Sequence, residues 1–340
     1  MGTIWDYLVV GHVTQDRRPD GSLTPGGTAA YAARTAYALG LRTAVLTSTD
    51  DATDLSAILP DVEIYRVPAA TSTVFENRYT ADGRVQFLHA CAAPLTPDVV
   101  RLLLSASAAP RVVRHEAERS GAAFVVRHEA ERSGTPAFVV RHEAERSGTP
   151  AFVVRHEAER SGAETERGRV GILHLGPVAR ECDPALADHI PADFLGLTPQ
   201  GWMRRWDGIG RVFPGPWEEA EALLPRASAV VLSEEDIGGD EALAARWAAQ
   251  TRILALTRGA RGCSVYADGR VWHLPAFPAP EVDPTGAGDV FAAVFFARLW
   301  LGDDPIQAAR RANCLAAVSV TRPGLSGTPT PAEVARCLSG

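Results

Sequence analysis

The chain has 340 residues, 46% hydrophobic and 22% charged, a length that allows one large α/β domain or two small ones. Its formal net charge of -7 provides no basic surface for a nucleic-acid backbone, so we expect a small-molecule partner and no nucleic acid. All 34 Lys and Arg positions hold arginine, which excludes sites that need a lysine amine, such as a Walker P-loop, a protein-kinase phosphate lysine, a pyridoxal phosphate Schiff base or a Schiff-base aldolase.

The cysteines and the N-terminus favour the cytoplasm. The first residues, MGTIWDYLVVGHV, lack the basic region and cleavage site of a signal peptide, and no apolar run approaches the roughly 18 residues of a membrane span. The cysteines are odd in number, far apart and without a CxxC pair, so we interpret them as buried thiols in a reducing compartment. They are Cys91, Cys182, Cys263, Cys314 and Cys337. The sequence therefore predicts a cytoplasmic protein that binds no membrane.

The first ninety residues alternate between strand and helix patterns. We predict strands at 4–13, 43–47 and 62–67, and helices at 28–39 and 52–59. This alternation is typical of a parallel sheet covered by helices. From Thr71 to His89 the pattern changes to two β-rich runs around Ala81, Asp82 and Gly83, which predicts an antiparallel flap at about 71–92.

A tandem repeat occupies the middle of the chain, at about 111–168. The segment VVRHEAERSG begins at Val112, Val125, Val139 and Val153, and units this short cannot form a solenoid. Each copy places Arg four residues before Glu, as a helical turn would, but Ser-Gly and Thr-Pro interrupt the copies, so helix, strand and disorder all remain open. We interpret the insertion as a duplication in a tolerated surface loop rather than as a metal-binding ladder of its histidines.

The α/β pattern resumes after Arg167. We predict strands at 170–175, 229–232 and 252–257, a hairpin at 263–274, and helices at 287–301, 305–321 and 331–338. We therefore expect a single α/β domain over residues 1–340, with the flap and the repeat as insertions.

The clearest chemical motif is DPTGAGDVF at 283–291, between a Pro-rich stretch and an apolar helix. Gly286 and Gly288 let backbone N–H groups approach an anion, and the helix that begins there adds the positive end of its dipole. The segment therefore predicts a phosphate site. Asp289, in the first turn of the helix, would either cap the helix or accept a proton from a hydroxyl beside the phosphate.

This motif closely resembles the C-terminal signature of the PfkB-type carbohydrate kinases, the ribokinase-like family, whose pattern also finds partners on both sides of the repeat. The resemblance implies a three-layer α/β/α domain with a mostly parallel central sheet and a small β lid. It also implies that Asp289 is the catalytic base and that the amides of Gly286, Ala287 and Gly288 form an anion hole. In that mechanism, a substrate hydroxyl loses its proton to Asp289 and attacks the γ-phosphate of ATP, while the amides and Mg²⁺ stabilise the transferring group.

Two N-terminal segments look like the sugar-binding segments of the family: GHVTQD at 11–16 and PGGT at 25–28. The resemblance implies that they bind the substrate that accepts the phosphoryl group. The residues assigned to the substrate are Asp16, Gly26, Gly27, Tyr31 and Asn77. Many relatives carry Asn where this chain has Tyr31, which would stack on a ring or donate one hydrogen bond, so ribose and fructose 6-phosphate do not follow from the resemblance. The flap falls where the family has its lid, and Glu76 is a second candidate there.

The donor side is implied by two loops that follow predicted strands. TRGARG at 257–262 resembles the T-x-G-x-x-G segment along the phosphates of ATP, and SEED at 233–236 stands in the place of the Asn-x-x-Glu motif of the family. The residues assigned to ATP are Ser233, Thr257, Gly259, Gly262 and Asn313. Asp236 would bind Mg²⁺ through water, although an acidic helix start explains this segment equally well.

Three further expectations concern a monovalent cation, the oligomeric state and Glu181. The resemblance allows a monovalent cation such as K⁺ near Asp283 and Thr285, and a homodimer formed through the lids. Glu181, after the predicted strand at 170–175, is a candidate neighbour of the substrate, but the run PVARE also fits an ordinary helix start.

Our leading hypothesis is an ATP-dependent kinase that phosphorylates a hydroxyl of a small sugar, nucleoside or cyclitol. The alternative is a catalytically weak or inactive sugar- or nucleotide-binding protein of the same fold, which is suggested by Tyr31, by the substitutions at Ser233 and Asp236, and by the repeat. A third hypothesis is an interaction scaffold that uses the charged repeats. The intact Asp289 favours the kinase.

Overall fold

A nine-stranded sheet forms the centre of the protein. The computed structural model describes residues 4–80, 83–106 and 169–339, so the predicted repeat and the turn residues 81–82 lie outside the described residues. The strands, in spatial order, are β15 (Arg270–Leu274), β14 (Cys263–Ala267), β13 (Ile253–Thr257), β12 (Ala229–Ser233), β9 (Ala192–Leu197), β8 (Val170–Leu175), β1 (Tyr7–Val10), β4 (Thr43–Thr49) and β5 (Glu63–Pro68). Neighbours from β13 to β5 pair in parallel, and β14 and β15 add an antiparallel hairpin at one edge.

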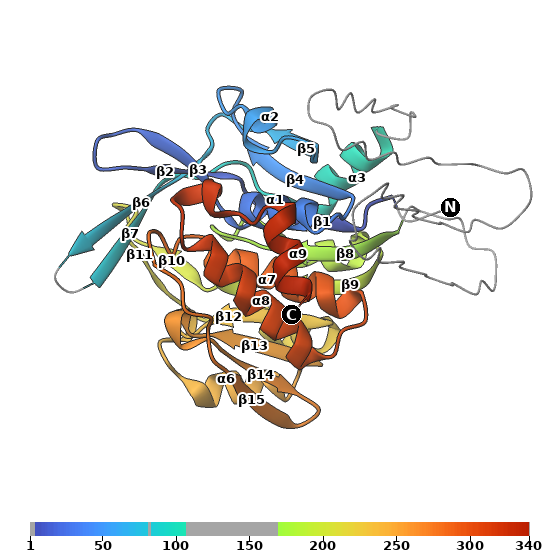
Figure 1. Cartoon of the computed structure of the whole chain (residues 1–340). Helices are drawn as coiled ribbons and strands as arrows, with labels where there is room; N and C mark the ends of the chain where they lie inside the picture. Colours follow the sequence, from blue (N-terminus) through green and yellow to red (C-terminus); the bar gives the residue numbers. More distant parts are fainter. Residues whose placement is uncertain (1–3, 81–82, 107–168, 340) are drawn as a thin grey trace, which may run out of the picture.

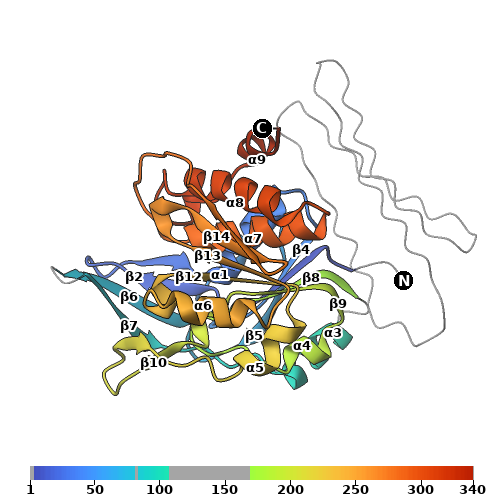
Figure 2. The same cartoon turned by 90° about the horizontal axis from the view of Figure 1, so that it is seen from below.

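Helices cover both faces of this sheet (Figures 1 and 2). One layer holds α1 (Thr28–Ala38), α2 (Leu55–Ile58), α7 (Ala287–Trp300), α8 (Pro305–Ser319) and α9 (Pro331–Ser339). The other holds α3 (Pro97–Ala106), α4 (Leu186–His189), α5 (Ala220–Leu223) and α6 (Glu241–Ala248). Alternate side chains of β1 face the two layers, with Tyr7 and Val9 in one core and Leu8 and Val10 in the other. The predicted three-layer α/β/α fold is confirmed.

Short 3₁₀ helices connect several of these elements. They are η1 (Pro199–Gly201), η2 (Leu224–Arg226), η3 (Glu235–Ile237), η4 (Gly259–Arg261) and η5 (Gly324–Gly327). Among the described residues, no helix is long and apolar enough to cross a membrane.

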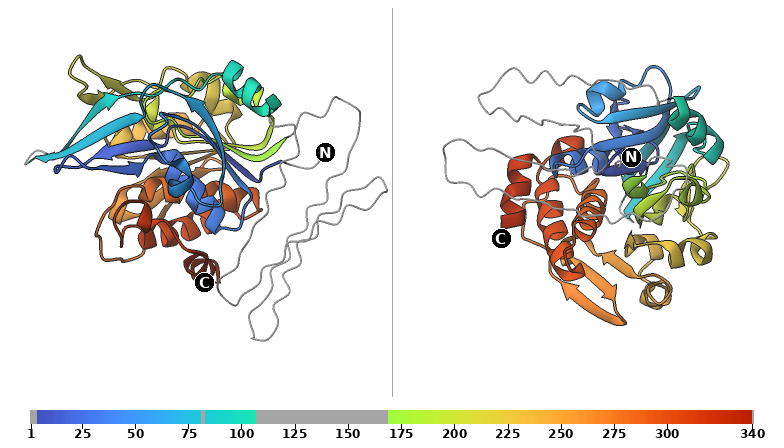
Figure 3. Two further views of the ribbon diagram at one scale, coloured as in Figure 1. Left: turned by 90° about the horizontal axis from the view of Figure 1, so that it is seen from above. Right: turned by 90° about the vertical axis from the view of Figure 1, so that its right-hand side faces the viewer.

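A second sheet projects from the carboxyl-end side of the central sheet, as Figure 3 shows. We call it the lid: β3 (Leu23–Gly26), β2 (Thr14–Arg17), β6 (Thr73–Thr80) and β7 (Gly83–Ala90), in spatial order. The sequence predicted only β6 and β7, and the structure adds β2, parallel to β6, and β3. A two-stranded sheet, β10 (Arg204–Trp206) with β11 (Val212–Pro214), lies against the lid, because Leu88 N donates to Gly210 O at 2.8 Å.

The prediction that all five cysteines are buried thiols is wrong. Cys314 on α8 and Cys337 on α9 form a disulfide, and Cys91 is exposed, whereas Cys182 and Cys263 are buried and free. The chain reverses between α8 and α9, which brings the two Cα atoms to 5.8 Å, within the range for a disulfide. A separation of 23 residues in the sequence carries no sign of this approach.

Reducing the disulfide is expected to destabilise the protein by about 3 kcal/mol, because the bond closes a loop of this length in the unfolded chain. The measurement is the unfolding free energy in urea with and without a reductant. The Cys314→Ser variant should show the same loss without reductant and no further loss with it. A wild-type midpoint that does not respond to reductant would contradict the bond.

Candidate active site

The predicted site residues gather at the carboxyl edge of the parallel strands, where open α/β sheets bind ligands. The chain leaves β1 at 11–13, β8 at 176–178, β12 at 233 and β13 at 257, and α1 and α7 begin at the same edge. Helices α1 and α7 pack against each other, and Thr28 Oγ1, at the start of α1, donates to Asp289 Oδ1 at 2.7 Å. Segments 261 residues apart thus meet at one carboxylate.

Asp289 lies in the first turn of α7 and is partly buried. Its loss of hydration raises the pKa of the carboxyl to about 6, with smaller contributions that raise it from Asp236 and Asp16. The hydrogen bond from Thr28 and the charge of Arg204 act in the opposite direction. A carboxylate with a pKa near neutrality is suited to general base catalysis, because it is ionised at pH 7 and still accepts a proton readily.

Replacing Thr28 by Val is expected to raise the pKa of Asp289, because the hydrogen bond from the hydroxyl stabilises the ionised carboxylate. Val keeps the methyl group that would contact a Cβ at Gly176, so packing is largely preserved. With Asp289 as the predicted base, turnover should fall as pH drops through about 6 in the wild type, and at higher pH in the variant. The measurement is the acid limb of kcat/KM, and a limb that does not move would contradict the coupling.

The predicted anion hole is the turn that begins α7. Gly286 has a φ of 81° and is the N-cap, and Ala287 N donates to Pro284 O at 3.2 Å, so the Ala287 amide takes part in the turn itself. A Cβ at Gly288 would meet nothing within 4 Å, which leaves open space beside this residue. Because first-turn N–H groups have no partner within their helix, the amide of Gly288 is suited to receive a phosphate oxygen.

Asp283 holds this turn in place. Its Oδ1 accepts from Thr285 N and its Oδ2 accepts from Gly324 N, each at 2.9 Å, which ties the loop before α7 to η5. Those bonds keep the pKa of Asp283 below its usual value although burial opposes them. The monovalent cation expected near Asp283 and Thr285 stays a prediction.

Tyr31 packs directly beneath the turn. A Cβ at Gly286 would lie 2.2 Å from one carbon of the Tyr31 ring, so the two segments touch at the glycine backbone. Tyr31 is only 2% exposed, and its ring offers no open face for a substrate to stack on. Burial raises the pKa of the phenol, as do the charges of Asp289 and Asp16, so the hydroxyl stays protonated beside these carboxylates. Of the two contacts expected for Tyr31, donation of one hydrogen bond fits this placement.

The acceptor segments lie close to Asp289. Asp16 is on β2, and a Cβ at Gly26 on β3 would come within 2.6 Å of its carboxylate. Gly27 has a φ of 89° and immediately precedes α1, and a Cβ there would lie 2.6 Å from His12 O. The paired glycines therefore let the chain turn into α1 close to the site.

The lid register separates the two candidates on β6. Phe75 pairs with Asp16 on β2 and packs against Val178 of the central domain, so these residues mark the lid face turned to the site. Asn77, two residues further along β6, lies on the same face, with its Oδ1 accepting from Gln86 Nε2 at 3.0 Å. Glu76 lies on the opposite face, with Arg78 and His89. The placement favours Asn77 over Glu76 as a substrate contact.

Glu181 supports the site from behind. Its buried carboxylate accepts from His12 N at 2.9 Å, from Val178 N at 3.0 Å and from Ala179 N at 2.7 Å, and therefore joins the ends of β1 and β8. The alternative of a helix start at this segment is wrong, because Arg180 adopts a φ of 61°. Glu181 is therefore a positioning residue.

Ser233 and Asp236 cap one another at the end of β12. Ser233 N donates to Asp236 Oδ2 at 2.8 Å, Asp236 N donates to Ser233 Oγ at 3.1 Å, and Gln200 Nε2 donates to Asp236 Oδ1 at 2.9 Å. The described residues hold no group of three or more His, Cys, Asp or Glu that would bind a metal ion directly. Each carboxylate oxygen of Asp236 still has a free lone pair. Asp236 can therefore bind Mg²⁺ through a water molecule.

The other residues predicted to bind ATP lie in the tight loop after β13 and at a buried position on α8. Thr257 ends β13, Gly259 begins η4, and Gly262 follows it with a φ of 91° where a Cβ would lie 2.0 Å from Leu274 O. Beside the loop, Arg258 pairs with Glu241 at 2.6 Å. Asn313 is buried on α8 and donates to Pro275 O at 3.2 Å, which fixes the segment after β15 where the adenine is expected.

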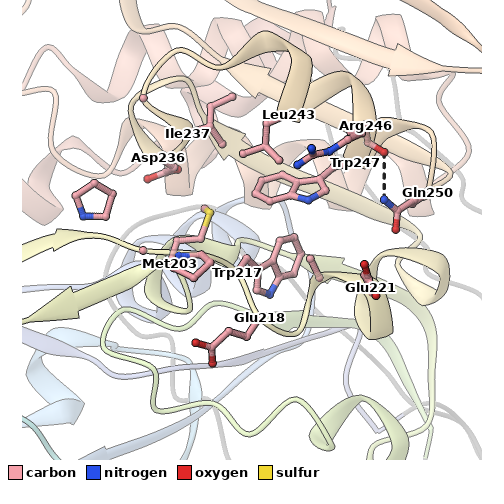
Figure 4. Close-up of a pocket in the computed structure, with 15 residues that line it drawn as sticks. Met203, Trp217, Glu218, Glu221, Asp236, Ile237, Leu243, Arg246, Trp247 and Gln250 are labelled. Atoms are coloured by element: carbon pink, nitrogen blue, oxygen red, sulfur yellow. Dashed lines mark hydrogen bonds between the residues drawn. The ribbon is translucent and has the colours of Figure 1, made fainter.

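A groove of about 840 Å³ lies on the α6 side of the sheet (Figure 4). Its lining comes from residues between 203 and 250, with Trp217 and Trp247 in its wall and Asp236 at one end. It is therefore separate from the turn at 286–289, and Asp236 is the predicted site residue that the two regions share.

Comparisons with known proteins identify relatives of part of this sequence. Residues 217–332 match the pfkB family carbohydrate kinase model. Over 132 residues the chain is 36% identical to inositol 3-kinase of Zea mays, covering 38% of this chain and 34% of that enzyme, so it spans about a third of its length.

Solved structures resemble nearly the whole chain. A pyrophosphate-dependent kinase in the ribokinase family, complexed with a pyrophosphate analog and myo-inositol, has a TM-score of 0.65 at 20% identity, covering 94% of this chain and 96% of that one. Ribokinase from Thermotoga maritima has a TM-score of 0.60 at 18% identity, covering 99% of this chain and 100% of that one. At these identities the likeness shows the fold. Residues 217–332 thus match the pfkB family of carbohydrate kinases, and the described chain has the fold of the ribokinase family.

Proposed function

We propose that the protein transfers the γ-phosphoryl group of ATP to a hydroxyl of a small polyol, with a cyclitol such as an inositol as the first candidate. The observation that carries this proposal is the Thr28–Asp289 hydrogen bond, which brings a carboxylate with a pKa of about 6 beside the acceptor segment and the turn at 286–288.

The reaction follows from this arrangement. The acceptor hydroxyl gives its proton to Asp289, its oxygen bonds to the γ-phosphorus, and the bond from that phosphorus to the bridging oxygen breaks as ADP leaves. The amides of Gly286 and Gly288 in the turn at 286–288 stabilise the equatorial oxygens of the transferring group, while the Ala287 amide closes the turn. Mg²⁺, when bound, neutralises charge on the donor phosphates, and Asp236 would hold it through water. Asp16, the Tyr31 hydroxyl and Asn77 would orient the acceptor.

Two likenesses support a cyclitol acceptor. The relative from Zea mays is an inositol 3-kinase, and the pyrophosphate-dependent neighbour binds myo-inositol. A ring with a hydroxyl on every carbon needs several hydrogen-bonding partners. Near Asp289, Asp16 supplies a hydrogen-bond acceptor, the Tyr31 hydroxyl a hydrogen-bond donor, and Asn77 an amide that can do both.

Pyrophosphate is a second candidate donor. The same neighbour uses pyrophosphate, and the Nδ2 of Asn313, expected at the adenine, already donates to Pro275 O and to Cys263 Sγ. A donor without adenine would leave that anchor undisturbed.

The test is a panel of inositols, sugars and nucleosides assayed with Mg-ATP and with Mg-pyrophosphate, with Asp289→Asn as the blank. We expect donor cleavage that depends on the acceptor and is absent from the blank, strongest with an inositol. Thermal stabilisation by acceptors without any cleavage would contradict the kinase and support a binding protein without turnover.

A further inference from the structure

Arg204 lies at the junction of the lid and the central domain. Its Nη1 donates to Val178 O at 2.8 Å, in the loop that leaves β8. Its guanidinium carbon lies 5.2 Å from the centre of the Phe75 ring, on the lid face turned to the site. The loop after β8 and the Phe75 ring of the lid thus hold the guanidinium from two sides. These contacts fix its position before a ligand binds.

The loop that holds Arg204 also approaches Thr28, the hydrogen-bond partner of Asp289, at Gly176, two residues before Val178. Val178 follows Gly176, where a Cβ would lie 2.6 Å from Thr28 Cγ2, and the Thr28 hydroxyl donates to Asp289. The charge of Arg204 lowers the pKa of Asp289, which agrees with this closeness. The other charged or titratable groups that act on this carboxylate are Asp16, Asp236, Tyr7 and Tyr31. Arg204 is therefore a cation beside the carboxylates around Asp289, and Arg18 is a second cation, which acts on Asp283 and Tyr31.

We propose that Arg204 binds the phosphoryl group during transfer, on the side of the reaction centre opposite the amides of the first turn of α7. A guanidinium offers a planar pair of N–H donors that matches phosphate oxygens, and in this chain without lysine it supplies the positive charge that the carboxylates require. Arg204 stays protonated throughout, and the bonds formed and broken are those of the proposed transfer, on which this inference rests.

Arg205 provides a matched control on the same strand. Its side chain points the other way and donates to Trp202 O at 2.7 Å and to Glu218 Oε1 at 3.0 Å, away from Asp289. The two arginines have the same size and charge and differ in the face of β10 that they occupy.

The kinetic experiment compares Arg204→Met, Arg204→Lys and Arg205→Met in the full chain. We expect Arg204→Met to lower kcat about a hundredfold, as loss of one transition-state donor does, with the acceptor KM nearly unchanged. The acid limb of its pH profile should move to higher pH, because Asp289 loses the neighbouring cation. Arg204→Lys should recover part of kcat, and Arg205→Met should keep it. A wild-type kcat in Arg204→Met, or a loss confined to acceptor KM, would overturn the proposal.

Anion binding gives a readout that does not need turnover. Inorganic pyrophosphate should raise the melting temperature of the wild type and of Arg205→Met, and this shift should be lost in Arg204→Met. A wild type that pyrophosphate stabilises but that transfers nothing would refute the proposed function and leave the role of Arg204 in anion binding standing. A wild type that transfers, beside an Arg204→Met variant that keeps both kcat and the shift, would refute the role of Arg204 alone.

Discussion

The Asp289→Asn variant is expected to bind ATP nearly as the wild type does and to transfer its phosphoryl group at least about a hundredfold more slowly, the scale of a lost general base. Asn has the shape of Asp and still accepts the hydrogen bond from Thr28 Oγ1, so the packing of α1 on α7 is retained. What it lacks is the ionised oxygen that takes the proton of the acceptor. The measurement is single-turnover transfer together with the dissociation constant of the donor.

Asp304→Asn is the control for this change. Asp304 caps α8, where its Oδ1 accepts from Ile306 N at 2.9 Å and from Gln307 N at 3.0 Å, and Asn caps a helix as well as Asp does. We expect wild-type turnover in this variant. An Asp289→Asn protein that turns over at the wild-type rate would show that Asp289 is not the base.

The Gly286→Ala variant is expected to lose most of its activity, because the new Cβ would lie 2.2 Å from a carbon of the Tyr31 ring at a residue with a φ of 81°. Neither the buried ring nor the backbone of α1 can move without shifting the turn that faces the phosphoryl group. We expect kcat to fall at least about a hundredfold, since small displacements of positioned groups cost this much.

Gly302→Ala separates the effect of the clash from that of the backbone. Gly302 follows α7 with a φ of 97°, but a Cβ there would meet nothing within 4 Å. This variant should lose about 1 kcal/mol of stability from the strained backbone and keep its turnover. Equal kcat values in the two alanine variants would contradict the positioning of the turn by Tyr31.

Local patterns in the sequence predicted the layers of the fold and the centre of the site. The buried strands and the helices at 28–39, 287–301 and 305–321 carry strong hydrophobic patterns, and each lies within a few residues of the predicted bounds. The motif at 283–291 placed Asp289 in a first helical turn, as observed. Strands β2 and β3 escaped prediction because polar residues, Pro and Gly dominate 14–26, and their pairing partner β6 is distant in the sequence.

The roles that the sequence could not assign depend on long-range contacts. Glu181 gains its role from amides on β1 and β8 loops, and Arg204 gains its role from Phe75 and Val178, none of which a local pattern can bring together. The two arginines between aromatic residues in GWMRRW at 201–206 are a signal in the sequence, but they do not distinguish Arg204 from Arg205. The disulfide between Cys314 and Cys337 depends in the same way on the packing of α9 against α8.

The most direct test of the central claim is ³¹P NMR of the wild-type protein with Mg-ATP and myo-inositol. The proposed mechanism predicts a phosphomonoester signal that grows in step with ADP, with no free orthophosphate. ADP accompanied only by orthophosphate, or unchanged ATP under conditions in which myo-inositol binds, would contradict phosphoryl transfer from ATP to this acceptor by Asp289 and the turn at 286–288.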